Sequence, residues 1–287
     1  DKAIEYFLML NGLTAVLILL GIFSILFYLG IKAFKEIAVS DFLFGTLWEP
    51  NSYEIPSYGI LAMLVSTLMV SFGSMLIAVP LGLGCALYLA EVASPRTREL
   101  LKPAIEVLAG IPSVVIGFIG VILIGPLISR LFGISNGLNA LNGSFLLAIM
   151  ALPTIISISE DAISAVPRHY REASMALGGN RWQTMTLVVV PAAFSGIVAS
   201  VMLGIGRAIG ETMTVLMATG NAAAMPSSLL DPVRTMTAAI AIELGEVAYD
   251  TTHYYALFSL GLMLFFLTFI FNLVADLVLH RYQNVQQ

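Results

Sequence analysis

Hydrophobic residues are concentrated in six long runs, which are separated by short polar segments. Each run approaches or exceeds the ~20 apolar residues that a helix needs to cross about 30 Å of hydrocarbon. The pattern therefore predicts an all-α integral membrane protein with about six transmembrane helices. The runs cover residues 7–31, 58–90, 105–128, 145–163, 193–218 and 254–279.

The polar segments between the runs contain no soluble domain and no convincing internal repeat. We therefore expect a single transmembrane domain over residues 1–287. Outside the runs, a helical loop is predicted at 167–192, interrupted at Gly178 and Gly179. The other polar segments are a connector at 35–57, a short charged loop at 91–103, a turn rich in Gly and Asn at 133–143, and a partly helical segment at 226–252.

The composition supports a membrane protein and argues against an enzyme. Hydrophobic residues make up 59% of the chain and charged residues 11%, whereas soluble domains carry about a quarter charged residues. The single cysteine, Cys85, excludes an intramolecular disulfide and a cysteine-based metal site. Three histidines do not suggest a metalloenzyme. No serine lies in a Gly-x-Ser-x-Gly motif.

The basic residues predict how the chain is oriented. Successive loops lie on alternate sides of the membrane, and one side then carries more Lys and Arg residues than the other. The positive-inside rule assigns the side with more of them to the cytoplasm. Both chain ends and the 91–103 and 167–192 segments are then cytoplasmic. The larger group is Lys2, Arg96, Arg98, Lys102, Arg168, Arg171, Arg181 and Arg281; the smaller is Lys32, Lys35, Arg130 and Arg234.

Two charges lie inside the fifth run, where a charge is costly and often marks a transport path. The i, i+4 spacing of Arg207 and Glu211 places both on one helical face, beside the small residues Gly206 and Gly210. The alternative is a neutralised pair that only holds helices together.

An arginine fork suits phosphate and carboxylate groups, so Arg207 is the candidate attraction point for an oxyanion. Hydroxyl groups on other runs would add neutral donors, although a hydroxyl in a helix often bonds its own backbone. These candidates are Ser66, Thr67, Ser71, Ser113 and Thr154.

Other charged residues have a simpler interpretation. Glu160 and Asp161 are expected at a solvated helix end. His169 and Glu172 do not complete a metal site, so the 167–192 segment is expected to form an interface with another protein. The chain contains no Gly-Lys dipeptide and therefore no Walker A phosphate-binding loop. Any ATP hydrolysis must come from another polypeptide.

One segment resembles the EAA loop of binding-protein-dependent ABC importer permeases. That motif is Glu-Ala-Ala, three residues, Gly, nine residues, then an aliphatic residue, any residue, an aliphatic residue and Pro. The chain matches it from Glu172 to Pro191, except that Ser174 replaces the second Ala. In the family this loop docks on the ATPase subunit. The resemblance therefore implies coupling roles for Glu172, Ala173, Gly178, Arg181 and Pro191.

Longer stretches resemble the phosphate permeases of this family, and among them the PstC type of subunit. They are IAVPLGLGCALYLAE (77–91), LAGIPSVVIGFIG (108–120), ALPTIISISEDAISAVP (151–167), GIGRAIGETMTVLMATGN (204–221) and PVRTMTAAIAIELGEVA (232–248). Ile116 departs from the tyrosine common in the family. Arg207 and Glu211 fall on the motif implicated in the anion path, to which Ser66, Thr67 and Ser113 are assigned as further candidates.

The resemblance implies a type I ABC importer permease (MetI-like) fold in a bacterial or archaeal cell membrane. The implied partners are a second permease similar to PstA, two ATPase subunits similar to PstB, and an external phosphate-binding protein similar to PstS. ATP and magnesium would be bound by the ATPase subunits, and this chain would hold no cofactor. Arg234, Glu243 and Glu246 would face the binding protein or the second permease, unless that helix simply lies at the membrane interface.

Two alternatives remain open at this point. An arginine-lined path would also serve sulfate, molybdate or tungstate. A stand-alone channel or an ion-coupled carrier would work without an ATPase and would need no EAA-type loop.

Overall fold

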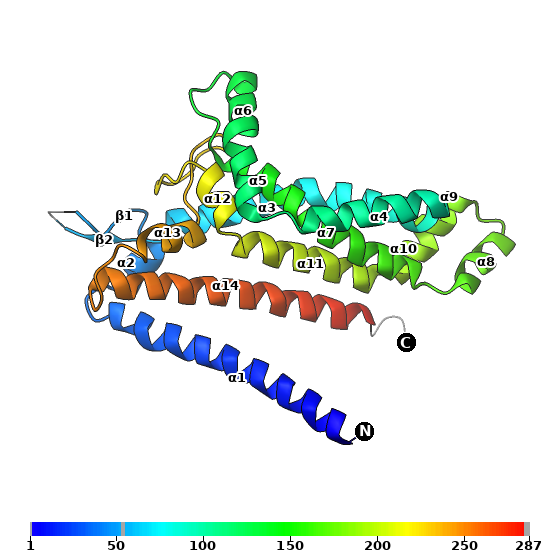
Figure 1. Ribbon diagram of the computed structural model, residues 1–287, viewed down its shortest axis with the longest axis horizontal. Helices are drawn as coiled ribbons and strands as arrows, with labels where there is room; N and C mark the ends of the chain where they lie inside the picture. The colour runs from blue at the N-terminus through cyan, green and yellow to red at the C-terminus, as the bar shows by residue number, and fades with distance from the viewer. Residues whose placement is uncertain (1, 53–54, 284–287) are drawn as a thin grey trace.

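The computed structural model describes the backbone of residues 2–52 and 55–283, and all side chains in these ranges except those of Ala3 and 278–283. The fold is helical, as predicted, and its only sheet in these ranges is one short antiparallel pair. Five long helices run along the molecule (Figure 1). They are α1 (Lys2–Ala33), α3 (Leu61–Leu87), α7 (Ala140–Ser164), α11 (Phe194–Gly210) and α14 (Thr252–Gln283).

The connecting elements gather at the two ends of the long helices (Figure 1). One end holds α8 (Arg168–Ala176), α9 (Arg181–Thr184) and both ends of the described chain. The other end holds α2 (Val39–Phe44), β1 (Trp48–Glu49), β2 (Ser57–Tyr58) and α13 (Met236–Glu243). The described part of the chain thus groups its loops on two sides as predicted; the side chain of Arg281 lies outside it.

The prediction of a charged loop at 91–103 was wrong, because most of this segment is helical. A π-helical turn, η1 (Tyr88–Val92), ends the second span, and α4 (Pro95–Ala109) follows it. Ser94 caps α4 by accepting a hydrogen bond from the Thr97 amide, and Pro95 occupies the first turn, where its missing N–H has no cost.

The third hydrophobic run is divided rather than continuous. Gly110 and Pro112 separate α4 from a second helical stretch composed of α5 (Ser113–Ile119), η2 (Gly120–Ile124) and α6 (Gly125–Phe132). This stretch of 20 residues is apolar enough to cross a membrane. In Figure 1, α6 stands at a steep angle to the long helices.

The fifth run is also broken. The segment from α9 through η3 (Met185–Val189) and α10 (Val190–Ala192) meets α11 at a bend of 69°. After α11 the chain leaves the helix at Glu211 and resumes as α12 (Met213–Ala218). By length and composition, the described residues contain five helices able to span a membrane, or six when the bent pair counts as one. This agrees with the predicted number of about six.

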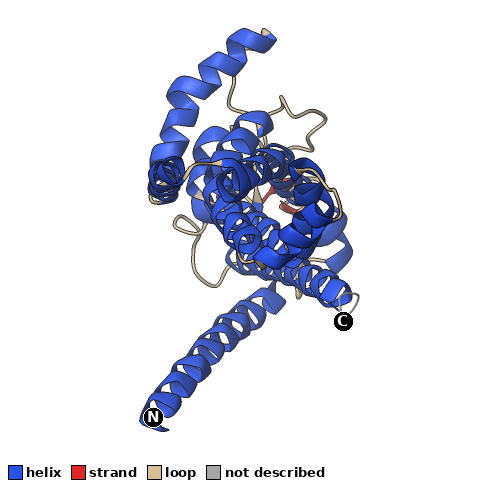
Figure 2. Ribbon diagram, turned by 90° about the vertical axis from the view of Figure 1, so that its right-hand side faces the viewer, coloured by secondary structure: helices blue, strands red, loops and turns tan. Residues whose placement is uncertain are grey.

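The core is formed where α3, α7 and α11 pack together. Its buried residues are mostly small or aliphatic, such as Ala78, Ala151 and Ile155. A Cβ atom at Gly82 of α3 would come within 2.7 Å of Ile155, so glycine permits the close approach of α3 and α7. By contrast, α1 projects from the bundle when viewed along the long helices (Figure 2).

Candidate translocation site and coupling network

Arg207 lies near the end of α11 and is half-buried. Its Nη1 atom is 3.5 Å from the Thr154 hydroxyl of α7, which is a long hydrogen bond. Thr154 was among the hydroxyl groups predicted to line a path. The structure thus brings one charged and one neutral donor together between α7 and α11.

The prediction that Glu211 shares a helical face with Arg207 was wrong. The helix ends at Gly210, and Glu211 adopts an extended conformation with a ψ of 134°. The i, i+4 spacing applies only within a helix. The Glu211 carboxylate instead accepts a hydrogen bond from the Thr214 amide at 3.3 Å. The backbone carbonyl of Glu211 accepts another from the Thr237 hydroxyl.

The side of α11 next to Arg207 is open in the single chain. A Cβ atom placed at Gly206 or Gly210 would meet no other atom within 4 Å. The two glycines therefore leave room for a helix of another chain to approach α11 closely.

Among the remaining candidate path residues, the hydroxyl groups of Ser66 and Thr67 have local partners. Ser66 donates to the Ala62 carbonyl at 2.7 Å and Thr67 to the Met63 carbonyl at 2.8 Å, both within α3. Thr67 also accepts a hydrogen bond from the Met236 amide, which fixes α13 against α3. The carbonyl of Ser113 accepts the Thr214 hydroxyl. For Ser66 and Thr67 these contacts are the helix-backbone bonds typical of such hydroxyls.

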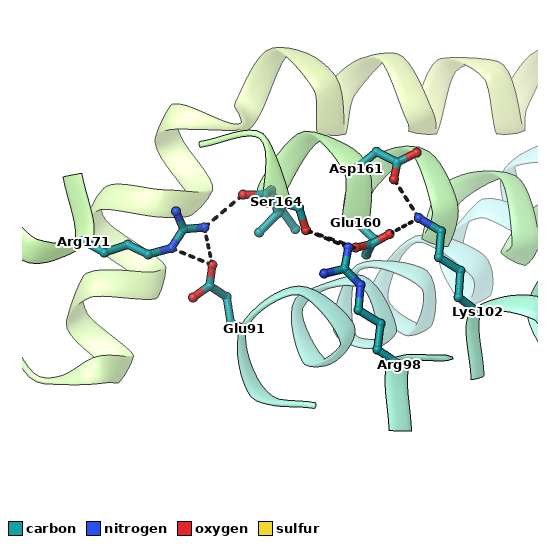
Figure 3. A network of polar contacts seen from close by, with 8 residues as sticks. Glu91, Arg98, Lys102, Glu160, Asp161, Ser164 and Arg171 are labelled. Carbon is teal, nitrogen blue, oxygen red and sulfur yellow. Dashed lines mark hydrogen bonds and ion pairs between the residues drawn. The ribbon is translucent and has the colours of Figure 1, made fainter. Parts of the chain in front are cut away.

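A charged cluster surrounds the end of α7 (Figure 3). Glu160 is 1% exposed, so the prediction of a solvated helix end was wrong for this residue. One carboxylate oxygen accepts hydrogen bonds from Arg98 and from the Ser164 hydroxyl, and the other from Lys102 at 2.6 Å. Asp161, with its side chain 66% exposed, accepts a second bond from Lys102.

Both cations of this cluster come from α4. The first part of this helix had been predicted to be a loop. Hydrogen bonds to Asp161 and Glu160 raise the pKa of Lys102, so its ammonium group stays charged. A buried carboxylate needs such paired and hydrogen-bonded neighbours because its desolvation is costly. Arg98 and Lys102 therefore form ion pairs with Glu160 and are not simply solvated charges.

Arg171 of α8 forms a second ionic contact beside this cluster (Figure 3). Its Nε and Nη2 atoms donate to the Glu91 carboxylate at 3.0 and 2.5 Å. Nη1 donates to the Val166 carbonyl at 2.6 Å, and Nη2 also donates to the Ile163 carbonyl at 3.0 Å. Sequence reasoning placed Arg171 only among the cytoplasmic charges and did not identify these contacts.

The EAA-like segment forms two helices around a glycine turn. Gly178 has a φ of +89°, a conformation that favours glycine. Asn180 and Gln183 form a reciprocal capping box at the start of α9. Glu172, Ala173 and Arg181 are exposed. Pro191 lies in α10.

Large apolar side chains are exposed on the same segment. Leu177 is 91% exposed, Leu187 72% and Trp182 68%. Exposed apolar side chains gathered in this way mark protein contacts when they lie outside lipid. Sequence reasoning named the segment as an interface but did not single out these side chains.

At the opposite end, Arg234 and Glu243 are bound to each other at 2.9 Å. The Glu243 carboxylate also accepts hydrogen bonds from Trp48 at 2.9 Å and from His253 at 2.8 Å. Burial alone would raise the pKa of Glu243, but the contacts with His253, Trp48 and Arg234 outweigh it and hold the pKa below its usual range. Glu246 is exposed. The predicted interface role of these residues stays a prediction.

Known families and curated proteins resemble this chain over most of its length. The family described as binding-protein-dependent transport system inner membrane component matches residues 78–284. A probable ABC transporter permease protein of Bacillus subtilis, YqgH, is 39% identical over 88% of this chain and 82% of its own length. The phosphate transport system permease protein PstC of Mesorhizobium japonicum is 35% identical over 93% of this chain and 86% of its own length.

Solved structures share the fold. A chain of a bacterial ABC transporter involved in the import of the acidic polysaccharide alginate matches with a TM-score of 0.65 and 16% identity, over 98% of both chains. The methionine ABC transporter MetNI matches with a TM-score of 0.58 and 18% identity, over 78% of this chain and 94% of that one. With this fold and the family match over most of its length, the chain belongs to the binding-protein-dependent transport system inner membrane components, which are multi-pass membrane permeases.

Proposed function

We propose that this chain is a membrane-spanning permease subunit of an ATP-driven phosphate importer and forms half of its translocation path. The observation that carries the proposal is the similarity to PstC proteins, such as 35% identity over 93% of the chain. A second PstC, from Haemophilus influenzae, is 32% identical over 96% of the chain.

Arg207 is the proposed anion contact. Its guanidinium group bonds Thr154 only at the limit of hydrogen-bond distance, and within the described residues the Glu211 carboxylate accepts the Thr214 amide rather than pairing with Arg207. In a low-dielectric path, a guanidinium group with free donors attracts a phosphate oxygen strongly. Thr154 supplies a neutral donor or acceptor next to it. The open face at Gly206 and Gly210 would be covered by a second permease, which would complete the path.

Energy and cargo delivery would come from partner subunits. The chain has no Walker A loop, so two ATPase subunits would bind ATP and magnesium. They would dock on the 167–192 segment, where Leu177 and Trp182 are exposed. A phosphate-binding protein would dock at the opposite end, where Arg234, Glu243 and Glu246 lie. In this arrangement, both chain ends and α8 would lie in the cytoplasm.

ATP-dependent uptake of radiolabelled phosphate tests the proposal directly. The chain would be reconstituted in proteoliposomes with its co-purified partners, with sulfate, molybdate and tungstate as competitors. Phosphate uptake that needs ATP and resists the competitors supports the proposal. Uptake of a different oxyanion would correct the cargo, and flux without any ATPase would contradict the importer.

A further inference from the structure

The end of α7 is attached to three other elements by charged side chains. Arg171 reaches it from α8, Glu91 lies opposite Arg171 on η1, and Arg98 and Lys102 approach from α4 (Figure 3). We call this set, Glu91, Arg98, Lys102, Glu160 and Arg171, the α7 clamp. Glu91 and Arg171 are 80 positions apart, and Arg98 and Glu160 are 62 apart, so the clamp joins η1 and α4 to the region where α7 ends and α8 follows.

Arg171 uses all three of its guanidinium nitrogens in the clamp. Two of its acceptors are the carbonyl of Ile163, in the last turn of α7, and the carbonyl of Val166, just after the helix. A positive charge is also favourable at this end of the helix dipole. The third acceptor, Glu91, is paired at 2.5 Å, and both side chains are 19% exposed. Arg171 therefore binds α8 to α7 and to η1 together.

Glu160 fixes α4 to the same helix end. Its carboxylate is buried, and both oxygens are occupied by cations. Removing one partner of a buried ion pair leaves an uncompensated charge, so such a contact resists separation. The α7 clamp thus holds α4, α8 and η1 on the last two turns of α7.

From this end, α7 leads to the candidate translocation site. Ser159 bonds Ser200 of α11 at 2.7 Å, and both side chains are fully buried. Thr154, which contacts Arg207, lies six residues before Glu160, or about 9 Å along the helix. Movement applied to the end of α7 would therefore displace Thr154 and Arg207 as well.

We propose that Arg171 is a positioning residue that transmits movement of the 167–192 segment to α7 and α11. Through the α7 clamp, the segment and the two helices move as one body. Without Arg171, only the short linker 165–167 joins α8 to α7, and the access to the site around Arg207 changes much less. The inference rests on the proposed function, since it needs an ATPase on the 167–192 segment.

The test uses a reporter that does not depend on the cargo. Gly206→Cys in a Cys85→Ser background places a thiol beside Arg207, where a Cβ atom meets nothing within 4 Å. In the complex with its ATPase partners, maleimide labelling of this thiol should change when ATP is added. Arg171→Gln should shrink that change about tenfold, within the usual range of coupling between sites. ATPase activity and subunit recovery should stay within about twofold of the parent.

Two further variants sharpen the result. Glu91→Gln removes the ion pair but leaves Arg171 free to bind the Ile163 and Val166 carbonyls, so it should lose less of the response than Arg171→Gln. Arg96→Gln is the matched control, because Arg96 is an exposed arginine at the start of α4. It should leave the response unchanged. Glu91→Gln also serves if Arg171→Gln cannot be purified.

The outcomes separate this inference from the proposed function. An unchanged ATP response in Arg171→Gln overturns the inference, as does a response lost only in proportion to lost subunits. A parent complex whose labelling never responds to ATP also overturns it. If labelling responds to ATP and depends on Arg171, but the parent takes up no phosphate, the inference stands and the proposed cargo is wrong.

Discussion

At the scale of single residues, the charges inside the helices fall into two classes. Glu160 is enclosed by donors, whereas Arg207 has one long bond to Thr154. Glu160 lies on α7 and Arg207 contacts α7 from α11, yet only Glu160 has its charge compensated. A compensated buried charge serves structure, and an uncompensated one is available to a ligand. This difference makes Arg207 the better candidate for transport.

Arg207→Ala should therefore reduce phosphate uptake about ten- to hundredfold, which corresponds to a lost hydrogen bond between charged groups of ~1.5–3 kcal/mol. Recovery of the partner subunits should not change, because the contacts of Arg207 within the chain are weak. Uptake into proteoliposomes and subunit stoichiometry measure the two effects. Arg130→Ala, at an exposed arginine on α6, is the control. Normal uptake by Arg207→Ala would refute the assignment.

Glu243 should make stability depend on pH. Its pKa is lowered from the usual 4.5 by His253, Trp48 and Arg234, against the effect of burial. A carboxylate whose pKa is lower in the folded state stabilises it above the unfolded pKa, and this contribution disappears as the pH falls through the folded pKa.

The stability difference between the parent and Glu243→Gln should accordingly be constant near neutral pH and shrink below about pH 4.5. Thermal unfolding in detergent over this range measures it. Glu246→Gln, at an exposed glutamate of the same segment, should show no such trend. A difference that grows toward acid pH would contradict the role given to Glu243.

At the scale of elements, the turn between α8 and α9 depends on one backbone conformation. Gly178 has a φ of +89°, and a Cβ atom there would have open space but a strained backbone. Gly178→Ala should cost about 1–2 kcal/mol locally, as for other L-residues in left-handed conformations, and so loosen the pairing of the two helices.

The measurable consequence of Gly178→Ala is weaker recovery of the ATPase subunits in detergent, together with reduced uptake. Gly245→Ala is a suitable control, since a Cβ atom at Gly245 also meets nothing within 4 Å and its φ is not positive. Full recovery and full uptake with Gly178→Ala would count against the docking role of this turn.

Hydropathy was sufficient to predict the helical class and the approximate span number, and the two glycines at 178 and 179 predicted the turn there. Hydropathy could not locate the break at Glu211, because apolar residues continue on both sides of it. The segment 91–103 was predicted as a short charged loop, but most of it is helical. Two of its charges, Arg98 and Lys102, pair with Glu160, which is 62 residues away from Arg98, and no local pattern contains that information.

The candidate site shows the same limit. Arg207 was identified from its cost inside a hydrophobic run, and the EAA-like spacing identified 167–192. The pairing of Arg207 with Glu211 failed because it assumed an uninterrupted helix. The contacts of Arg171 with Glu91 and with the α7 carbonyls depend on how η1, α7 and α8 pack, which only the three-dimensional structure reveals.

At the scale of the whole molecule, the elements form two opposite ends joined by the long helices (Figure 1). The proposed orientation places α8 and Arg96 in the cytoplasm and Asn51, after β1, outside. In a Cys85→Ser background, Asn51→Cys should react with an impermeant maleimide added to intact cells, and Arg96→Cys only after the membrane is opened. The reverse pattern would invert the topology.

The length of the projecting helix α1 makes its tilt depend on the thickness of the membrane. Its apolar stretch, Ile4–Ala33, has 30 residues, or ~45 Å, which exceeds a hydrocarbon layer of about 30 Å. A helix of this length must tilt to stay in lipid, and thinner bilayers demand more tilt. Gly30 packs directly on the backbone of Ser259 and accepts a hydrogen bond from its hydroxyl, and Phe23 contacts Phe265. We therefore expect a change in the tilt of α1, imposed by the surrounding lipid, to act on α14 through these contacts.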